Sequence, residues 1–454
     1  MLGQKKILIL FFLLFSILYF FFYPLTIGIV DETAYLSTAY TLQKGSIYYE
    51  QAGITSVPAM IEAKGHLVSR YPPGNSILLL PFTTINWRFS FLRGYLLMGL
   101  GYLLVILLLS HFRLSVFYSL LFLFHPSFIL YSRTIMSDLP GCIFILLALY
   151  LFIKNKPCFA GLIFGLGIAI RYPLLLIPGA LGLVLILQNR IKEFLKVAIG
   201  TIIGILPLLF YHLLLFNSPL DPIKASAVGF SIKNFPNMFL NISVSLNLLY
   251  PFLLIIPFFA KLKEKWIFIT PAIFFVVFFS FYYFRDTGQN FWEALVLQQR
   301  FMLPVIPFLL IPYTEMLQNQ KIINKLGTIF IPLLFFSSVV ISYAHQRFLK
   351  EEISYQKKLY TFAKDADLII CNKDVFELIN PYIKPLRWVP FEIEGRLVFP
   401  KEYKDSDRNI LFICLARQIR IRTLFEEFLC QFPEAKEIYR ETHPFYFSFY
   451  QLFK

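Results

Sequence analysis

The chain has 454 residues, 57% of them hydrophobic, and a mean hydropathy of +0.66. Only 15% of the residues are charged, against about a quarter in soluble proteins, so a water-soluble globule is excluded. The net charge of +15 does not indicate nucleic acid binding, because residues 344–454 are nearly neutral, with 18 basic and 16 acidic residues. The excess basic charge lies in short loops between hydrophobic runs, which is typical of membrane topology.

Hydrophobic runs of about 20 residues can cross a bilayer as helices, and the sequence contains roughly eleven candidates. They lie at about 7–25, 91–110, 114–131, 138–153, 157–170, 173–188, 197–216, 239–260, 266–284, 301–317 and 326–343. The fifth and sixth are short and interrupted by Pro173 and Pro178, so they could form a hairpin of half-helices instead of two crossings. We predict an all-α polytopic membrane domain over residues 1–343, with a count uncertain by one or two spans.

Basic residues predict the orientation of the chain, because Lys and Arg accumulate in cytoplasmic loops. If the N-terminus lies in the cytoplasm, the short inner loops are all basic, and Asp31, Glu32 and Asp138 fall on the outer side. The first outer loop, residues 26–90, holds an apolar stretch at 75–85 that is too short to span and suits a helix in the membrane interface. We therefore expect a multi-pass protein of the cell (cytoplasmic) membrane with an extracytoplasmic site.

Residues 344–454 have the composition of an ordinary soluble domain. The segments 367–371 and 409–414 are predicted as buried strands, and 374–382 and 423–432 as helices. An odd number of spans places this small α/β domain outside the cytoplasm. It carries no glycine-rich phosphate loop, and the five cysteines of the chain form no CxxC or Cys/His cluster, so we assign it no cofactor, zinc site or disulfide.

Paired acids, Asp31 and Glu32, directly follow the first hydrophobic run. A carboxylate at the membrane surface lies within reach of a lipid headgroup and can act as a general base on an incoming hydroxyl. The alternative is a solvated pair that marks the end of a helix, and the spacing alone favours that alternative slightly.

Asp138 opens the fourth predicted span, directly after Ser137. Either residue could be an N-cap, which stabilises the start of a helix by about 1 kcal/mol. The other interpretation is a second carboxylate that faces Asp31 and holds a metal or a sugar hydroxyl. The residues alone favour the two interpretations equally.

Several basic residues could bind an anionic headgroup on the outer side. Lys64, His66 and Arg70 precede the prolines that open the interfacial helix, although a turn with solvated basic residues is the simpler interpretation. Arg300 precedes the tenth span and could either extend into water or hold a phosphate. Arg171 lies between two short apolar segments, where an unpaired charge is costly and usually functional, with a structural ion pair as the alternative.

Five motifs in chain order resemble those of the GT-C superfamily of membrane glycosyltransferases, and the pattern fits its protein O-mannosyltransferase and lipid A aminoarabinose transferase branch. They are Asp31-Glu32, Tyr71-Pro72-Pro73-Gly74, Tyr131-Ser132-Arg133 through Asp138, Ala169-Ile170-Arg171-Tyr172 and Arg300-Phe301-Met302-Leu303-Pro304. The resemblance covers about residues 1–343. Each motif alone is weak, and their order carries the resemblance.

The resemblance implies a GT-C-like fold and transfer of a sugar, with inversion, from a polyprenyl monophosphate to an acceptor hydroxyl on a lipid, glycan or protein. It implies that Asp31 is the catalytic acid of the first loop, that Asp138 is its second-loop counterpart, and that Arg300 is a candidate for the donor phosphate. The branch often carries Lys or His just before its two prolines, whereas this chain has Arg70 and Tyr71 there. That departure leaves the identities of donor and acceptor open.

The implied chemistry agrees with the predicted topology. Nucleotide sugars do not occur outside the cytoplasmic membrane, so an outward-facing enzyme needs a lipid-linked donor. Asp31 would deprotonate the acceptor, and Arg171 and Arg300 would stabilise the charge that develops on the departing phosphate. A divalent metal (Mg²⁺, Mn²⁺ or Zn²⁺) bridging Asp31 and Asp138 could do similar work, but some relatives manage without one, so no cofactor is assigned with certainty.

Two other classes of protein remain as alternatives. A polytopic transporter or lipid flippase would explain the spans and the arginines, but the two halves of the chain show no repeat with matching broken helices. A glycan ligase or polymerase that uses a diphosphate-linked donor would share the GT-C pattern. The sequence favours the glycosyltransferase with a monophosphate donor.

Overall fold

The computed structural model describes residues 2–49, 59–216, 218, 221, 229–283, 291–319, 321–393, 396–397, 409–417, 419–442 and 445–452. It forms two compact units, which are described separately. The helical unit comprises Met1–Tyr23, Pro72–Leu78 and Phe89–Gln346. The loop–tail unit comprises Pro24–Tyr71, Leu79–Arg88 and Arg347–Lys454. Most of the first loop, which we placed with residues 1–343 from the sequence, therefore groups in space with the C-terminal residues.

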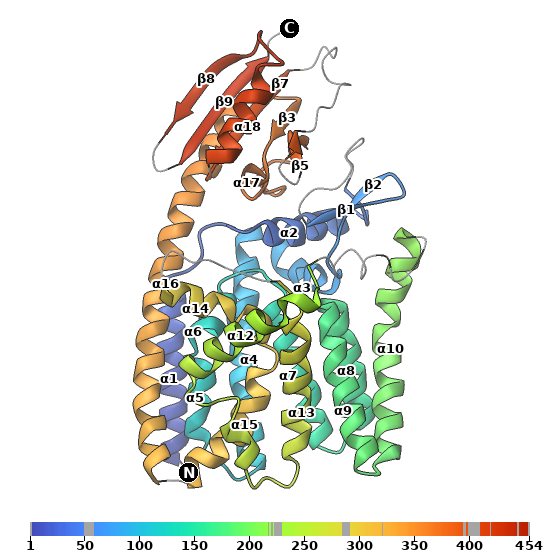
Figure 1. The fold of residues 1–454 in the computed structure, drawn as a ribbon, viewed down its shortest axis with the longest axis vertical. Coiled ribbons are helices and arrows are strands. Elements are labelled where there is room, and N and C mark those ends of the chain that lie inside the picture. Colours follow the sequence, from blue (N-terminus) through green and yellow to red (C-terminus); the bar gives the residue numbers. More distant parts are fainter. Residues whose placement is uncertain are drawn as a thin grey trace. The chain divides into compact units, whose positions relative to one another are not determined.

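The helical unit contains helices that run side by side (Figure 1). Its α-helices are α1 (Leu2–Phe21), α4 (Ser90–His111), α5 (Ser119–Leu123), α6 (Pro126–Ser132), α7 (Asp138–Ile153), α8 (Pro157–Ile170), α9 (Leu176–Leu187), α10 (Ile191–Leu215), α12 (Phe235–Leu249), α13 (Lys265–Ser280), α14 (Phe291–Gln298), α15 (Ile306–Asn319) and the first part of α16 (Lys321–Phe362). Short 3-10 helices connect them: η2 (Val116–Tyr118), η3 (Tyr172–Leu175), η4 (Ile232–Asn234), η5 (Ile256–Phe259) and η6 (Arg300–Met302).

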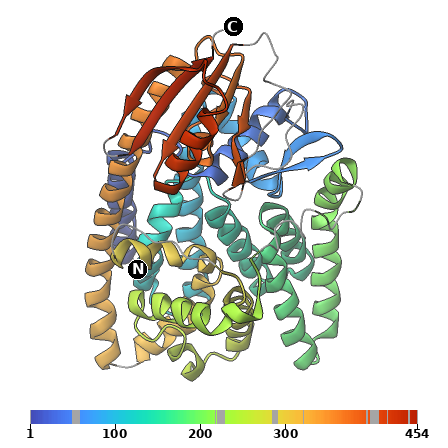
Figure 2. The ribbon, with the colours of Figure 1, turned by 45° about the horizontal axis from the view of Figure 1, so that its top comes forward.

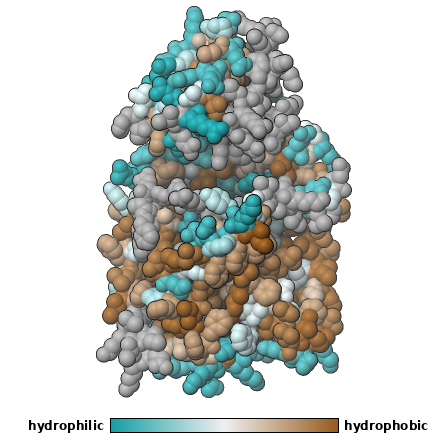
Figure 3. Space-filling model, viewed as in Figure 1, coloured by the Kyte–Doolittle hydropathy of each residue, from teal (hydrophilic) through white to brown (hydrophobic). Residues whose placement is uncertain are grey.

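Apolar side chains gather on the outside of this unit, as Figure 3 shows, and many are large and exposed. Among the described residues, three helices are long and apolar enough to cross a membrane: Trp87–His111, Ile191–Leu215 and Ile329–Phe362. Five shorter apolar helices accompany them. The structure thus confirms a mostly helical, apolar protein, whereas the number of eleven spans stays a prediction.

Two predicted spans do not form continuous helices, and proline is the reason in both. In the run at 114–131, α5 ends at Leu123 and α6 begins at Pro126. A proline disfavours helical backbone in the residue before it, so His125 is extended, and its ring accepts the amide of Ser127 at 3.2 Å. In the run at 239–260, α12 ends at Leu249, and Tyr250, which precedes another proline, is also extended.

Glycines bring α8 and α10 into close contact. A methyl group on Gly161 would lie 2.2 Å from the carbonyl oxygen of Val197, and one on Gly165 would lie 2.4 Å from that of Thr201. Gly167 faces only ordinary van der Waals neighbours. The missing side chains of Gly161 and Gly165 therefore allow α8 and α10 to pack closely.

In the loop–tail unit, the first loop forms a helix, α2 (Val30–Gln43), and an antiparallel hairpin of β1 (Met60–Ala63) and β2 (His66–Ser69). The helix predicted at 75–85 is observed as α3 (Gly74–Thr83), whose residues are divided between the two units, and the 3-10 helix η1 (Trp87–Phe89) follows it. Its place in the membrane interface stays a prediction. Residues 50–58 lie outside the described part of the chain.

The tail forms a five-stranded sheet of order β4-β3-β7-β9-β8 (Figure 2). Its strands are β3 (Leu368–Cys371), β4 (Trp388–Pro390), β7 (Ile410–Ala416), β8 (Lys436–Glu441) and β9 (Tyr446–Leu452). The remaining elements of the tail are α17 (Lys373–Phe376), β5 (Glu392–Ile393), β6 (Arg396–Leu397) and α18 (Ile419–Leu429). Strands β4, β3 and β7 are parallel, and β9 and β8 continue the sheet antiparallel. The predicted small α/β domain is confirmed.

Helices cover both faces of this sheet. On one face, Phe428 of α18 packs against Phe412 of β7. On the other, Tyr355 and the last turns of α16 pack against Phe447 of β9. Helix α16 therefore continues to Phe362, well beyond the boundary that we predicted at 343/344. The helix predicted at 374–382 ends at Phe376, and the one predicted at 423–432 begins earlier, at Ile419.

Candidate functional site

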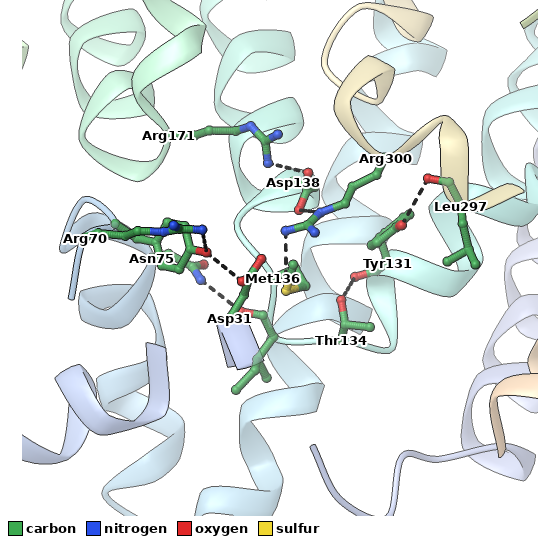
Figure 4. Close-up of polar contacts among 12 residues, drawn as sticks. Asp31, Arg70, Asn75, Tyr131, Thr134, Met136, Asp138, Arg171, Leu297 and Arg300 are labelled. Atoms are coloured by element: carbon green, nitrogen blue, oxygen red, sulfur yellow. Dashed lines mark hydrogen bonds and ion pairs between the residues drawn. The ribbon is translucent and has the colours of Figure 1, made fainter. Parts of the chain in front are cut away.

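In the helical unit, Asp138 lies in the first turn of α7 and is fully buried. Its two carboxylate oxygens face two arginines: Arg171 Nη1 contacts Oδ1, and Arg300 Nε lies 3.3 Å from Oδ2 (Figure 4). The Ser137 side chain makes no capping hydrogen bond. Asp138 is therefore the partner of two cations that approach from elements distant in the sequence. Capping does not explain this residue, and Arg171 has its charge compensated.

The aromatic ring of Phe301 lies beside the two arginines that face Asp138. Phe301, next to Arg300 in η6, lies 5.0 Å from the Arg171 guanidinium and 5.3 Å from that of Arg300. It also contacts the rings of Phe279 of α13, at 5.0 Å between centroids, and of Tyr282, at 5.5 Å. Because a cation is attracted to the face of a ring, Phe301 helps to hold both guanidinium groups near Asp138.

A small, largely apolar pocket adjoins the group. The space between its lining residues, about 220 Å³, includes open solvent. Its lining residues are Met238, Ile242, Phe279, Tyr282, Gln298, Phe301 and Met302. The helical unit thus places a fixed pair of cations directly beside apolar surface, which is the combination that a lipid phosphate requires.

Arg133 has a role that the sequence did not predict. It is almost completely buried and donates hydrogen bonds to the carbonyl oxygens of Phe22, at 2.6 and 3.0 Å, and Ser342, at 2.9 Å, and to Gln346 at 2.8 Å. It therefore connects the end of α1 with α16 and satisfies buried carbonyl groups. The motif that contains it was visible in the sequence, but nothing local distinguished a structural arginine from one that binds ligand.

In the loop–tail unit, Asp31 lies in the first turn of α2. The Tyr71 hydroxyl donates to Asp31 Oδ1 at 2.6 Å, and Arg70 Nη2 donates to the Tyr71 oxygen at 3.1 Å. Burial raises the pKa of Tyr71 well above its usual value, and the charge of Asp31 adds to this effect. Tyr71 therefore remains a donor throughout the physiological range and orients the Asp31 carboxylate.

Glu32 has a different local role. Its Oε2 accepts the backbone amide of Gly28 at 2.9 Å, so the carboxylate closes the turn that leads into α2. This geometry gives Glu32 a structural function in the loop. A direct part in catalysis, which we predicted for Glu32 beside Asp31, stays a prediction.

The hairpin carries the two remaining basic candidates. Lys64 lies in its turn, with a positive φ of 50°, and His66 begins β2 and stacks on Tyr48 at 4.1 Å between centroids. The loop–tail unit thus brings Arg70 and Tyr71 to Asp31, and the helical unit brings Arg171 and Arg300 to Asp138. The predicted convergence of the two carboxylates concerns residues of different units and stays a prediction.

The described residues offer limited support for a metal. No group of three or more His, Cys, Asp or Glu side chains among them is arranged to hold a metal ion. Both oxygens of Asp138 already face guanidinium groups, so a cation would have to displace an arginine there. A metal shared by Asp31 and Asp138 stays an untested prediction.

Replacing Tyr71 by Phe tests its bond to Asp31. A hydrogen bond donated to a carboxylate stabilises its charged form, and bonds to charged groups contribute about 1.5–3 kcal/mol. If Asp31 is the base, we expect the acid limb of the pH–rate profile in Tyr71→Phe to move to higher pH by roughly one to two units.

The control for this variant is Tyr48→Phe, which removes a hydroxyl from the same loop. Its profile should coincide with that of the unaltered protein. An unmoved acid limb in Tyr71→Phe, measured on folded protein, would contradict the proposed link between the hydroxyl and the base.

Comparison with known proteins identifies the fold of the chain. No family model and no curated protein matches the chain. A solved structure of ArnT from Cupriavidus metallidurans in the apo state is similar over 99% of this chain and 98% of that chain, with a TM-score of 0.61 and 12% identity. The fold is that of ArnT.

A second structure of the same protein, bound to undecaprenyl phosphate, is similar over 98% of each chain, with a TM-score of 0.59 and 13% identity. At identities of 12% and 13% the likeness shows the fold alone, and this fold agrees with the resemblance found in the sequence motifs.

Proposed function

We propose that the protein is an inverting glycosyltransferase that moves a sugar from a polyprenyl-phosphate donor to an acceptor hydroxyl on the extracytoplasmic face of the membrane. The observation that carries the proposal is the likeness to ArnT over nearly the whole chain, because one of the similar structures holds undecaprenyl phosphate. The group around Asp31 would supply the base, and the two arginines that face Asp138 would bind the donor phosphate.

Asp31 is the proposed base. Its carboxylate takes the proton of the acceptor hydroxyl, and the acceptor oxygen attacks the anomeric carbon from the face opposite the phosphate. The bond between that carbon and the phosphate oxygen breaks, and its electron pair leaves with the polyprenyl phosphate. The Tyr71 hydrogen bond, at 2.6 Å, keeps one Asp31 oxygen in place during this step.

Arg300 and Arg171 are the proposed partners of the donor phosphate. A guanidinium can bind phosphate through paired hydrogen bonds, and a fixed positive charge stabilises the charge that develops as the phosphate departs. Asp138 compensates both cations in the absence of ligand and keeps them oriented. The neighbouring apolar pocket would receive the first part of the prenyl chain.

Neither alternative class has a specific observation in its favour. A transporter or flippase would not need a carboxylate oriented by a buried tyrosine. A ligase or polymerase differs from the proposed enzyme in its donor, which is linked through a diphosphate. The experiment below separates the two. The sugar, hexose or pentose, and the acceptor, whether lipid, glycan or protein, are left to the same experiment.

The purified full chain in lipid nanodiscs should be titrated with undecaprenyl phosphate and, separately, with undecaprenyl diphosphate. We expect the monophosphate to bind more tightly and to raise the unfolding temperature, since a ligand that binds only the folded state stabilises it. Undecaprenyl-phosphate sugars that carry a labelled hexose or pentose should then be incubated with the chain together with lipid, glycan and protein acceptors, and the release of the label from the donor lipid should be measured.

Tighter binding of the diphosphate would favour the ligase or polymerase. Binding of the monophosphate without release of any label would favour a flippase and contradict the proposed transferase.

A further inference from the structure

The segment that carries Asp31 is attached to the C-terminal part of the chain within the loop–tail unit. Thr26, five residues before Asp31, donates its hydroxyl to Gln356 Oε1 at 3.0 Å. The amide group of Gln356 donates in turn to the carbonyl oxygen of Leu378, at 2.9 Å. Gln356 lies on α16, and both Gln356 and Thr26 are buried. One side chain therefore joins the approach to α2, helix α16 and the turn after α17.

The backbone before α2 also lies close against α16. A methyl group on Gly28 would come within 2.5 Å of the Phe348 ring, so only glycine fits there without movement of the ring. Ala34, one turn into α2, is part of the same hydrophobic core as Tyr355 and Leu359 of α16 and strand β3 of the tail. The contact is continuous from the turn before Asp31 to the turn after it.

A partly buried charge cluster lies beside the same contact. Arg417, at the end of β7, pairs with Glu352 of α16 and with Glu377, whose Oε2 it contacts at 3.0 Å. The carbonyl oxygen of Glu377 accepts the hydroxyl of Thr33 on α2, at 3.4 Å. The arginine thus fixes the residue against which α2 rests.

We propose that Gln356 is a positioning residue for Asp31: it attaches the segment before α2 to the C-terminal domain and thereby sets the place of the Asp31 carboxylate. Through Gln356, the C-terminal domain then helps to position the proposed base. The inference rests on the proposed function for the role of Asp31, while the attachment itself is independent of any activity.

The attachment is tested by hydrogen–deuterium exchange of the full chain in nanodiscs. In Gln356→Leu and in Thr26→Val, which removes the hydroxyl at nearly constant volume, we expect residues 25–36 to exchange at least about fivefold faster, because local opening becomes easier. Thr26→Ser keeps the hydroxyl and should restore slow exchange. Thr361→Ala, on the same helix, is the matched control, because that hydroxyl donates to the Lys357 carbonyl oxygen of its own helix.

The positioning role is tested by the rate of label release per folded protein. We expect kcat to fall about tenfold in Gln356→Leu and Thr26→Val with the donor KM unchanged, since misplacement by about 1 Å can cost about 10²-fold. Thr26→Ser and Thr361→Ala should keep their rates. A purely structural role would lower the yield of folded protein without changing kcat.

Unchanged exchange of residues 25–36 in both altered proteins would overturn the proposal. So would an unchanged kcat accompanied by faster exchange, because the attachment would then not govern Asp31. If the unaltered chain releases no label from any donor, the proposed function fails, and the exchange measurement alone decides whether Gln356 holds the segment.

Discussion

Asp31→Asn should abolish sugar transfer and leave the protein folded. The amide has nearly the shape of the carboxylate and can still accept the Tyr71 hydrogen bond, so α2 should keep its place. It cannot take a proton from the acceptor, and loss of a general base lowers rates by about 10²–10⁴-fold. The measurement is label release per folded protein, together with the unfolding temperature and the affinity for undecaprenyl phosphate, which should both stay near those of the unaltered chain.

Two further variants make the result specific. Asp365→Asn makes the same change at an exposed aspartate of the loop–tail unit and should leave transfer unaffected. Asp31→Glu keeps the carboxylate but displaces it by one methylene group, so an intermediate rate is expected. Full turnover by Asp31→Asn would refute its assignment as the base and would direct attention to Glu32.

Arg300→Gln should produce the second largest loss. Removing one preorganised group that stabilises transition-state charge typically lowers kcat by about 10²–10³-fold. The affinity for undecaprenyl phosphate should fall as well, because the guanidinium is proposed to bind the free lipid phosphate. Arg300→Lys retains the charge without the planar paired geometry, so it should recover only part of the rate.

The control for Arg300 is another arginine with an acidic partner. Arg190 contacts Glu193 at 2.6 Å in the connection between α9 and α10, so Arg190→Gln also breaks an ion pair in the helical unit. That variant should keep both the rate and the affinity. If it loses as much as Arg300→Gln, the effect comes from weakened folding and not from the donor phosphate.

Removal of Asp138 would be less specific, which is why Arg300 is the better test of the donor phosphate. Asp138 is completely buried, and its loss would leave Arg171 and Arg300 without their carboxylate. Breaking a buried ion pair by removing one partner destabilises a protein by about 3–5 kcal/mol. A low rate in that variant would therefore mix unfolding with lost function.

Much of the architecture follows from composition and local pattern. Long apolar runs can be stable only as helices in lipid, so most helices of the helical unit were predictable from hydropathy. The soluble tail, two of its strands and the short helix after Pro72 and Pro73 were predictable in the same way. The exceptions were the two runs that prolines divide, at Pro126 and Pro251, where a local steric rule outweighed the hydrophobic pattern.

Composition and local pattern were enough to predict a helical membrane protein with a small α/β tail and to name the candidate acids and arginines. The partners of these residues became visible in the folded chain, because these contacts join residues far apart in the sequence. Arg300 is 162 residues from Asp138, Tyr71 is 40 from Asp31, and Gln356 is 330 from Thr26. Hydropathy and helical periodicity act over one span or turn, whereas the partner of a buried charge depends on how distant elements pack.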